Sequence, residues 1–175
     1  MIPVPMAPKR RLSHIGDGNR PRMVDVGGKA VTRRTAHAVA VVVLPRALAR
    51  MLQGGEIDGP KGPIFQAATL AGIMGAKRTA DLIPLCHPLP LDNCSIEIKP
   101  QSPKKDGSVE VEVHCRARTR ARTGVEMEAL TAVQVGLLTI YDMVKAIDRG
   151  MVMENIRVLE KHGGKSGSWT ATSGR

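Results

Sequence analysis

A strictly alternating run near the middle of the chain constrains the fold most. Between Val109 and Ala117, every second residue is Val, Cys or Ala, and the residues between them are Glu, His or Arg. Successive side chains of a strand point to opposite faces, so this run predicts a strand with one buried and one solvated face. The shorter run Cys94–Lys99 precedes it across the turn-forming segment PQSPKKDGS. Together they predict an antiparallel pair covered on one side.

The other segments complete an order of elements. Ala36–Leu44 is apolar and β-branched and predicts a buried strand; Pro45–Gln53 and Ile64–Thr79 predict helices. Glu126–Ile147 predicts a long helix and Ile156–Leu159 a last strand. The order strand, helices, strand, strand, helix, strand is that of the ferredoxin-like split βαβ fold. We therefore expect an α+β protein whose antiparallel sheet carries its helices on one face.

The 175 residues suit one domain. Residues 1–20 are rich in Pro, Gly and Arg without periodicity and predict a disordered basic arm, followed by one folded domain over 21–170 and a flexible tail over 171–175. No apolar run is long enough to predict a membrane span. Three cysteines without a C-x-x-C pair predict neither a disulfide framework nor a structural zinc site. We expect the reducing cytoplasm, or an organellar matrix if the arm is a targeting remnant.

The net charge of +10 predicts an anionic partner. Proteins that read single-stranded nucleic acid stack bases on aromatic side chains, and this chain has only Phe65, Tyr141 and Trp169. A small phosphorylated ligand is therefore favoured over nucleic acid. The rival hypothesis is a basic RNA-binding module of the same fold, which nucleic acid co-purifying through a salt wash would support.

A proline-rich segment, Leu82–Leu91, places Cys86 and His87 on a stiff loop or edge strand. The two side chains could be zinc ligands, a nucleophile with its base, or a buried thiol beside an imidazole with a structural role. Neighbours on an extended chain point to opposite faces, which argues against a shared metal or a nucleophile and base pair.

The long helix carries three features of interest. Thr123 and Glu126 have the spacing of a capping box. Ala129–Tyr141 is apolar nearly all round, more than one sheet face can cover, so we expect self-association. Asp142 and Lys145 meet on one helix face, and such a pair is ordinarily a surface salt bridge. Here they end an apolar stripe through Leu138 and Val135, which predicts the lip of a core or interface.

Four segments resemble the MoaC family of molybdenum cofactor biosynthesis proteins, from about Arg22 to Trp169. They are LIPLCHPLPL, TGVEMEAL, YDMVKAID and, near the C-terminus, KHGGKSG. The resemblance implies conversion of 3′,8-cyclo-7,8-dihydroguanosine 5′-triphosphate into cyclic pyranopterin monophosphate and diphosphate. It implies a phosphorus–oxygen lyase that works by general acid/base catalysis with no metal and no cofactor. It also implies a homohexamer, a trimer of dimers, with sites at subunit boundaries.

The resemblance also assigns roles to residues. The implied catalytic residues are Asp142, Lys145 and Lys61, the last in P-K-G-P, where Pro63 replaces an acidic residue of the family. The implied substrate-binding residues are Leu85, Cys86, His87, Glu126, Met127, Glu128, Asp25 and Arg34.

The C-terminal KHGGKSG lacks the first glycine and the following helix of a phosphate-binding Walker A loop, so that motif is excluded. Its glycines with Lys161 and Lys165 still predict a phosphate clamp, because backbone N–H and ammonium groups both favour oxyanions.

Overall fold

The computed structural model describes residues 14–172, and residues 1–13 of the predicted arm and 173–175 of the predicted tail lie outside them. A 3-10 turn, Asp17–Asn19, lies in the described part of the arm. The strands are β1 Thr32–Leu44, β2 Asp58–Gly59, β3 Gly62–Pro63, β4 Asn93–Pro100, β5 Val109–Ala121, β6 Val152–His162 and β7 Trp169–Thr170. The helices are α1 Arg46–Ala49, α2 Ile64–Lys77, α3 Thr79–Leu82 and α4 Glu126–Val144.

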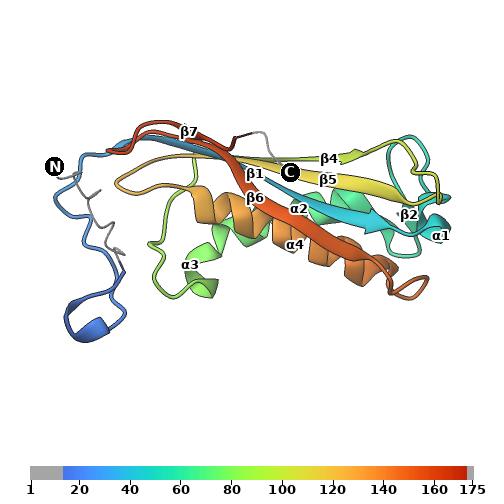
Figure 1. Cartoon of the computed structure of the whole chain (residues 1–175), viewed down its shortest axis with the longest axis horizontal. Helices are drawn as coiled ribbons and strands as arrows, with labels where there is room; N and C mark the ends of the chain where they lie inside the picture. Colours follow the sequence, from blue (N-terminus) through green and yellow to red (C-terminus); the bar gives the residue numbers. More distant parts are fainter. Residues whose placement is uncertain (1–13, 173–175) are drawn as a thin grey trace, which may run out of the picture.

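The sheet has the strand order β4-β5-β1-β6-β7, and each neighbouring pair is antiparallel. The longest ladder joins β1 to β5, from Thr32 opposite Ala121 to Leu44 opposite Val109. Figure 1 shows α2 and α4 lying along one face of this sheet, with the other face bare. The predicted ferredoxin-like α+β fold, with helices on one face, is confirmed.

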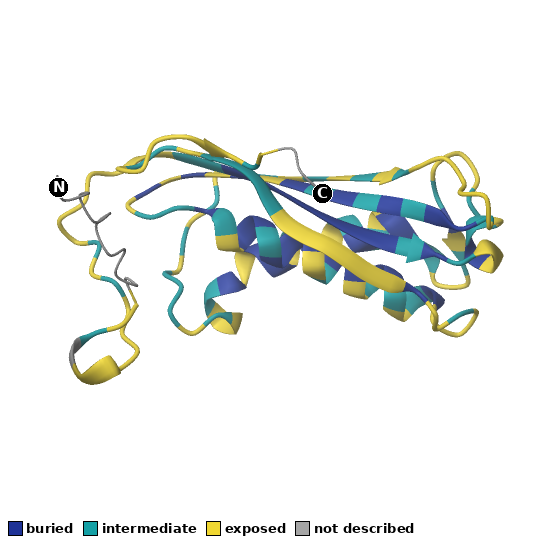
Figure 2. Cartoon of the chain, viewed as in Figure 1, coloured by how far each residue is buried: buried dark blue, intermediate teal, exposed yellow. Residues whose placement is uncertain are grey.

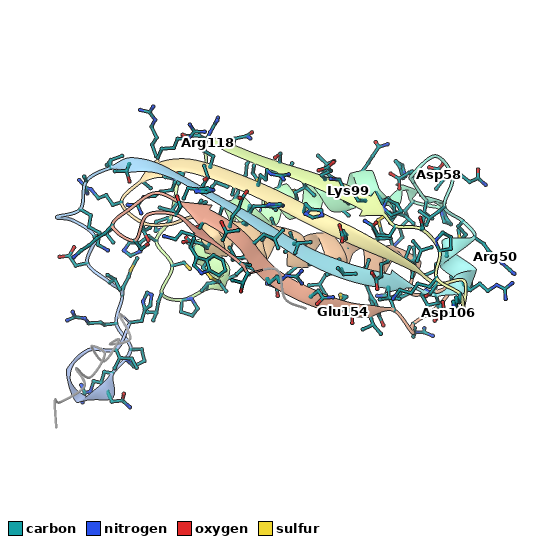
Figure 3. The ribbon with its side chains drawn as sticks, turned by 45° about the horizontal axis from the view of Figure 1, so that its top comes forward. Arg50, Asp58, Lys99, Asp106, Arg118 and Glu154 are labelled. Carbon is teal, nitrogen blue, oxygen red and sulfur yellow. The ribbon has the colours of Figure 1, made fainter. Side chains whose placement is uncertain are left out.

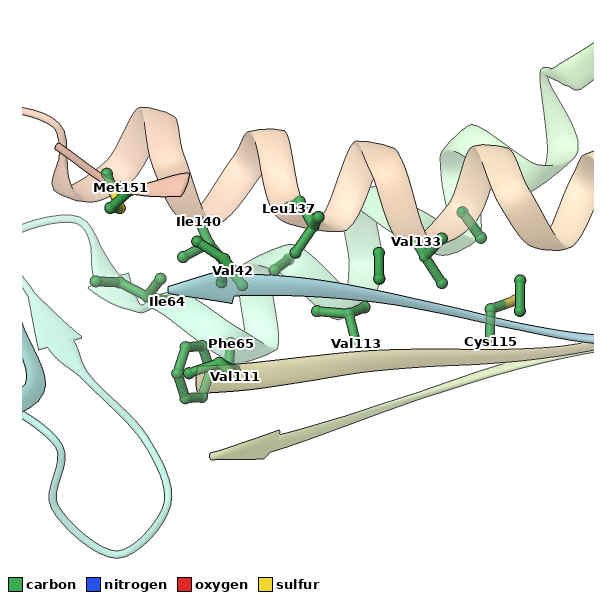
Figure 4. Packing of buried hydrophobic residues seen from close by; sticks show 14 of the residues in the cluster. Val42, Ile64, Phe65, Val111, Val113, Cys115, Val133, Leu137, Ile140 and Met151 are labelled. Carbon is green, nitrogen blue, oxygen red and sulfur yellow. The ribbon is translucent and has the colours of Figure 1, made fainter. Parts of the chain in front are cut away.

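The core lies between the sheet and the helices. The alternation in β5 appears as predicted, with Val111, Val113 and Cys115 fully buried. Figure 4 shows these side chains directed toward α4, where Leu137 and Ile140 meet them. In Figure 2 the buried colour is concentrated where sheet and helices face each other, and most of β6 is exposed. Aliphatic side chains therefore build this core, with Phe65 as its one buried aromatic in the described residues.

The glycines of α2 allow a close approach to its neighbours. A Cβ at Gly72 would overlap Ile96 of β4 and the Ala132 carbonyl of α4, and one at Gly75 would overlap Val135. These two glycines therefore mark close packing of α2, at a cost in helix propensity.

The start of α2 is capped from a distance. Pro63 occupies the position before the first helical residue, and its side chain forms no capping hydrogen bond. Instead the Glu56 carboxylate accepts hydrogen bonds from the backbone N–H groups of Phe65 at 2.8 Å and Gln66 at 3.2 Å. A carboxylate near a helix N-terminus also interacts favourably with the helix dipole. Pro63 therefore leaves the start of the helix intact.

Several predicted elements differ from the observed ones. Strand β1 begins four residues before Ala36, and β6 covers 152–162 rather than 156–159. The predicted helix Pro45–Gln53 is only the four residues of α1. The capping box is wrong, because α4 begins at Glu126 itself, Val125 precedes it, and no side chain caps it. The glycine-rich tail is a hairpin that ends in β7, which the sequence reasoning missed.

Helix α4 is, by length and hydropathy, the one helix of residues 14–172 that could span a membrane, contrary to the sequence expectation. Half of that stretch is buried inside the fold, where it packs against the sheet. A core helix explains this composition. All three cysteines are free thiols.

Candidate functional site

A hollow of about 230 Å³ lies where α4 begins, between the N-terminal segment and the proline-rich loop. It is lined by His14, Val24, Val26, Lys29, Leu85, Cys86, His87, Leu89, Thr123, Gly124, Glu126, Met127 and Glu128. Six residues that the family resemblance assigns to substrate binding are therefore brought together, from two segments about forty residues apart in the chain. The loop and the first turn of α4 form its walls.

Cys86 and His87 both line this hollow, and the segment that carries them is not the fully extended one that the expectation of opposite faces assumed. The reason is local. The Cys86 N–H donates to the Ile83 carbonyl at 3.0 Å, which makes a turn rather than an extended segment. Leu82, the first residue of the predicted non-helical run, ends α3. Burial, and then the nearby Glu128 carboxylate, raise the pKa of the Cys86 thiol, which disfavours a reactive thiolate.

Glu126 and Glu128 give the hollow an acidic wall. Glu128 is only 4% exposed. Burial raises the pKa of the Glu128 carboxyl, and the charge of Glu126 raises it further. Both residues lie in the first turn of α4, where the helix dipole favours negative charge. Two neighbouring carboxyl groups at one helix end can accept paired N–H donors from a planar ligand.

A second hollow of about 390 Å³ adjoins the first, because both are lined by Lys29, Thr123, Gly124 and Glu126. Its other lining residues are Arg34, Thr35, Arg122, Lys161, His162, Gly163, Lys165 and Ser166. Three residues predicted to bind substrate, Arg34, Lys161 and Lys165, therefore lie together. The acidic hollow passes into a cationic one.

Arg34 is held against the glycines of the β6–β7 hairpin. Gly163 and Gly164 have φ values of 97° and 77°, and a Cβ at Gly164 would overlap the Arg34 guanidinium. Only glycine permits this approach. The Nε atom of Arg34 is buried without a hydrogen-bond partner, which leaves a donor for an oxyanion. Lys161 Nζ donates to Ser166 Oγ and, at 2.9 Å, to the Gly167 carbonyl, so it braces the hairpin.

Asp25 lies outside the residues that line the two hollows, although Val24 and Val26 line the first. Its Oδ1 accepts a hydrogen bond from the Gly27 N–H at 2.7 Å. This contact makes a turn that shapes the segment leading to Lys29.

The three residues assigned to catalysis lie at the other end of the molecule. Lys145 Nζ donates to Asp142 Oδ1 at 2.6 Å, and both side chains are at least half exposed. Lys145 and, more weakly, Lys61 in the turn between β2 and β3 lower the pKa of Asp142. Since a helix rises about 1.5 Å per residue, Asp142 lies roughly 20 Å from Glu128. Within one chain the two groups do not meet.

The apolar stripe beside Asp142 was expected to lead to a core or an interface. Within the chain it is not buried. Leu138 is 56% exposed and Val135 is partly exposed. On α2, Leu70 and Met74 are also exposed, at 65% and 54%. We name these four residues of α2 and α4 the helical apolar face; the fold leaves three of them largely exposed and covers Val135 in part.

Among residues 14–172, no group of three or more His, Cys, Asp or Glu side chains is placed to hold a metal ion. The absence of a metal in the reaction stays a prediction.

Comparison with known proteins identifies the family. The model of the MoaC family matches residues 23–164. The chain belongs to the MoaC family. It is 50% identical over 163 residues to the cyclic pyranopterin monophosphate synthase of Streptomyces coelicolor, covering 93% of this chain and 91% of that protein.

Two further relatives carry the same name. The protein of Novosphingobium aromaticivorans is 51% identical over 160 residues, which cover 91% of this chain and 97% of that protein. The protein of Streptomyces avermitilis is 50% identical over 160 residues, covering 91% and 89%. The predicted membership of the MoaC family is therefore confirmed.

Lining residues that the sequence reasoning missed include Lys29, Arg122 and His162. Lys29 follows two glycines outside the four segments named above, and Arg122 directly precedes one of them, TGVEMEAL. Neither had an apolar pattern around it that would distinguish it from a solvated cation.

Proposed function

We propose that this chain is a cyclic pyranopterin monophosphate synthase of molybdenum cofactor biosynthesis. It converts 3′,8-cyclo-7,8-dihydroguanosine 5′-triphosphate into cyclic pyranopterin monophosphate and releases diphosphate, as a phosphorus–oxygen lyase. The observation that carries the proposal is the pair of adjoining hollows, one with an acidic wall and one with a cationic wall, in a chain of the MoaC family.

The two hollows suit the two ends of this substrate. A carboxylate of Glu126 or Glu128 can accept the ring N–H and the amino group of a guanine-derived edge in parallel hydrogen bonds. Arg34, with its unpartnered buried Nε, and the ammonium group of Lys165 suit the triphosphate. Glu126 lines both hollows, so one bound molecule can occupy them together.

Asp142, Lys145 and Lys61 are proposed to carry the proton transfers. The reaction rearranges a ring and joins a sugar hydroxyl to the α-phosphate, which requires a general base and acid and a cation near the phosphate. The Asp142 carboxylate is the proposed proton acceptor, and the Lys145 ammonium group, which donates a hydrogen bond to it, is the proposed donor. No electron-carrying cofactor or metal is required by these steps.

The site is proposed to form between two chains, because Asp142 lies roughly 20 Å from the hollow of its own chain. The helical apolar face runs along α2 and α4, between the two ends of α4. If two chains pair antiparallel through this face, the Asp142 end of one α4 meets the Glu128 end of the other. Three such dimers would make the proposed cytoplasmic hexamer.

The test is to incubate the purified chain with the cyclic dihydroguanosine triphosphate and follow the cyclic monophosphate and diphosphate together. Equal amounts of both products support the proposal. A folded protein that binds the substrate and releases neither product contradicts it. Co-purifying nucleic acid that survives a salt wash, in such an inactive protein, would favour the RNA-binding alternative.

A further inference from the structure

Three arginines gather on the bare face of the sheet, on the side away from the helices. Arg118 and Arg120 are exposed residues of β5, and Arg33 is exposed near the start of β1. Arg33 lies directly opposite Arg120 in the antiparallel register, and Arg118 is opposite Thr35. In Figure 3 Arg118 lies at the end of the sheet remote from Arg50 and Asp106. We name these three residues the outer arginine cluster.

Like charges placed directly opposite in a sheet destabilise it. Arg116, the next outward residue of β5, faces Glu97 at 3.9 Å. Farther along the same face Glu110 pairs with Lys104, and Glu112 with His114. None of the ion pairs formed within residues 14–172 includes a member of the outer arginine cluster. The other outward charged residues of β5 are therefore paired, and those of the outer arginine cluster are not.

The cluster surrounds a hollow of about 350 Å³, lined by Arg33, Asp92, Arg118 and Arg120. Asp92 is its one acidic lining residue, and its backbone N–H donates to the Arg118 carbonyl at 2.9 Å. Three guanidinium groups against one carboxylate leave two positive charges facing a concave surface. Arginine forks bind phosphate groups through paired N–H donors, and such pairs are stronger than neutral hydrogen bonds.

This hollow shares no lining residue with the two hollows of the candidate site. Arg33 and Arg34 are successive residues of β1, so their side chains leave opposite faces of the strand. Arg34 lines the cationic hollow of the site and Arg33 lines the outer one. The two hollows are therefore separated by the backbone of the strand.

We propose that the outer arginine cluster is a second anion-binding site, which takes a small phosphorylated anion of the diphosphate or triphosphate type. A concave site with several converging donors suits a compact anion. An extended single strand of nucleic acid would need a longer basic groove with aromatic side chains, and the cluster has none among its lining residues. The proposal does not depend on the activity of the enzyme.

The test is calorimetric titration of the full-length protein with inorganic diphosphate at low salt. Arg118→Gln/Arg120→Gln removes the outer site, and Arg34→Gln/Lys165→Gln removes the inner one. The control, Arg50→Gln/Lys105→Gln, removes the same charge from exposed positions elsewhere. We expect the wild type and the control to bind at two independent sites. Each test variant should lose one of them, with affinity there weaker by at least about tenfold.

Thermal unfolding gives a second readout. Loss of Arg120 relieves the repulsion from Arg33, so the outer variant should melt no lower than the wild type, and diphosphate should raise its melting temperature less. Binding of diphosphate that is unchanged in the outer variant, or equally weakened in the control, would overturn the proposal. So would an RNA oligonucleotide that displaces diphosphate from this site at lower concentration. Turnover of the outer variant should match the wild type, which separates this result from a failure of the proposed function.

Discussion

At the scale of single residues, the first hollow is shaped by a turn of the proline-rich loop. Leu85, Cys86 and His87 form one wall with the residues that begin α4. Their joint placement depends on the turn in which the Cys86 N–H donates to the Ile83 carbonyl. Pro84 at the second position favours this turn, but the prolines alone do not separate it from an extended loop. The stripe beside Asp142 was predicted to lead to a core or an interface, and it is not buried within one chain. An apolar stripe indicates that something covers it, but cannot tell whether the cover is the same chain.

The Asp142–Lys145 pair is either a surface salt bridge or a catalytic pair, and substitutions of the two residues distinguish these interpretations. Both side chains are exposed, so Asp142→Asn and Lys145→Ala should leave the melting temperature nearly unchanged. If the pair transfers protons, each variant should lower turnover by about 10²-fold or more. Single-turnover release of diphosphate measures this, with Lys105→Ala as an exposed control. Near-normal turnover in either folded variant would refute the assignment.

The buried His37 makes the stability of the fold depend on pH. It is buried on the bare face of the sheet, and its Nε2 lies 3.1 Å from His114 Nδ1. Burial lowers the pKa of His37, and Arg116, His114 and Lys99 lower it further, while Glu160 opposes them. The unfolded chain therefore takes up this proton at higher pH than the folded one. The contribution of neutral His37 to the stability of the fold is fully present above about pH 6.5. It is lost as the pH falls toward the lowered pKa of His37 in the folded state.

Urea unfolding between pH 5 and pH 8 measures this effect. The acid loss of stability should be smaller in His37→Gln, which cannot titrate, and unchanged in His14→Gln, a control at an exposed position. Equal pH slopes in the wild type and His37→Gln would contradict the account.

At the scale of elements, alternation located β4 and β5 to within a few residues, because one face of β5 is buried and one face of β4 is partly buried. Strand β1 extends farther than predicted since its first residues are polar and gain their strand geometry from pairing with β5. The β6–β7 hairpin was missed because its glycines, at positive φ, indicate a turn without indicating what it joins. Pairing with strands distant in sequence determines both the start of β1 and the β6–β7 hairpin.

The start of α2 also depends on a residue outside the element, because Glu56 caps the helix. Glu56→Ala leaves the N–H groups of Phe65 and Gln66 without their acceptor and should lower the free energy of unfolding by about 1 to 2 kcal/mol. Glu56→Gln keeps one acceptor oxygen and should lose less. Asp58→Ala, at an exposed neighbour, should change it by less than about 0.5 kcal/mol. Denaturant unfolding of the three variants compares them, and an equal loss in the alanine variants would contradict the capping role.

At the scale of the whole molecule, the fold places the residues assigned to substrate binding and those assigned to catalysis at opposite ends of α4. The two hollows lie where α4 begins, and Asp142 with Lys145 lies where it ends. The helical apolar face between them is uncovered. The sequence predicted self-association from the composition of α4, but the distance between the two halves of the site required the structure. A site shared between two chains is the central claim.

Complementation between two inactive variants tests this claim most directly. Asp142→Asn and Glu128→Gln should each abolish turnover alone, and both should remain oligomeric by sedimentation. In a mixed dimer, one site carries both substitutions and the other carries neither. Co-expression in equal amounts should therefore restore about a quarter of the wild-type turnover. If the co-expressed variants are no more active than either variant alone, the site lies within one chain and the account is wrong.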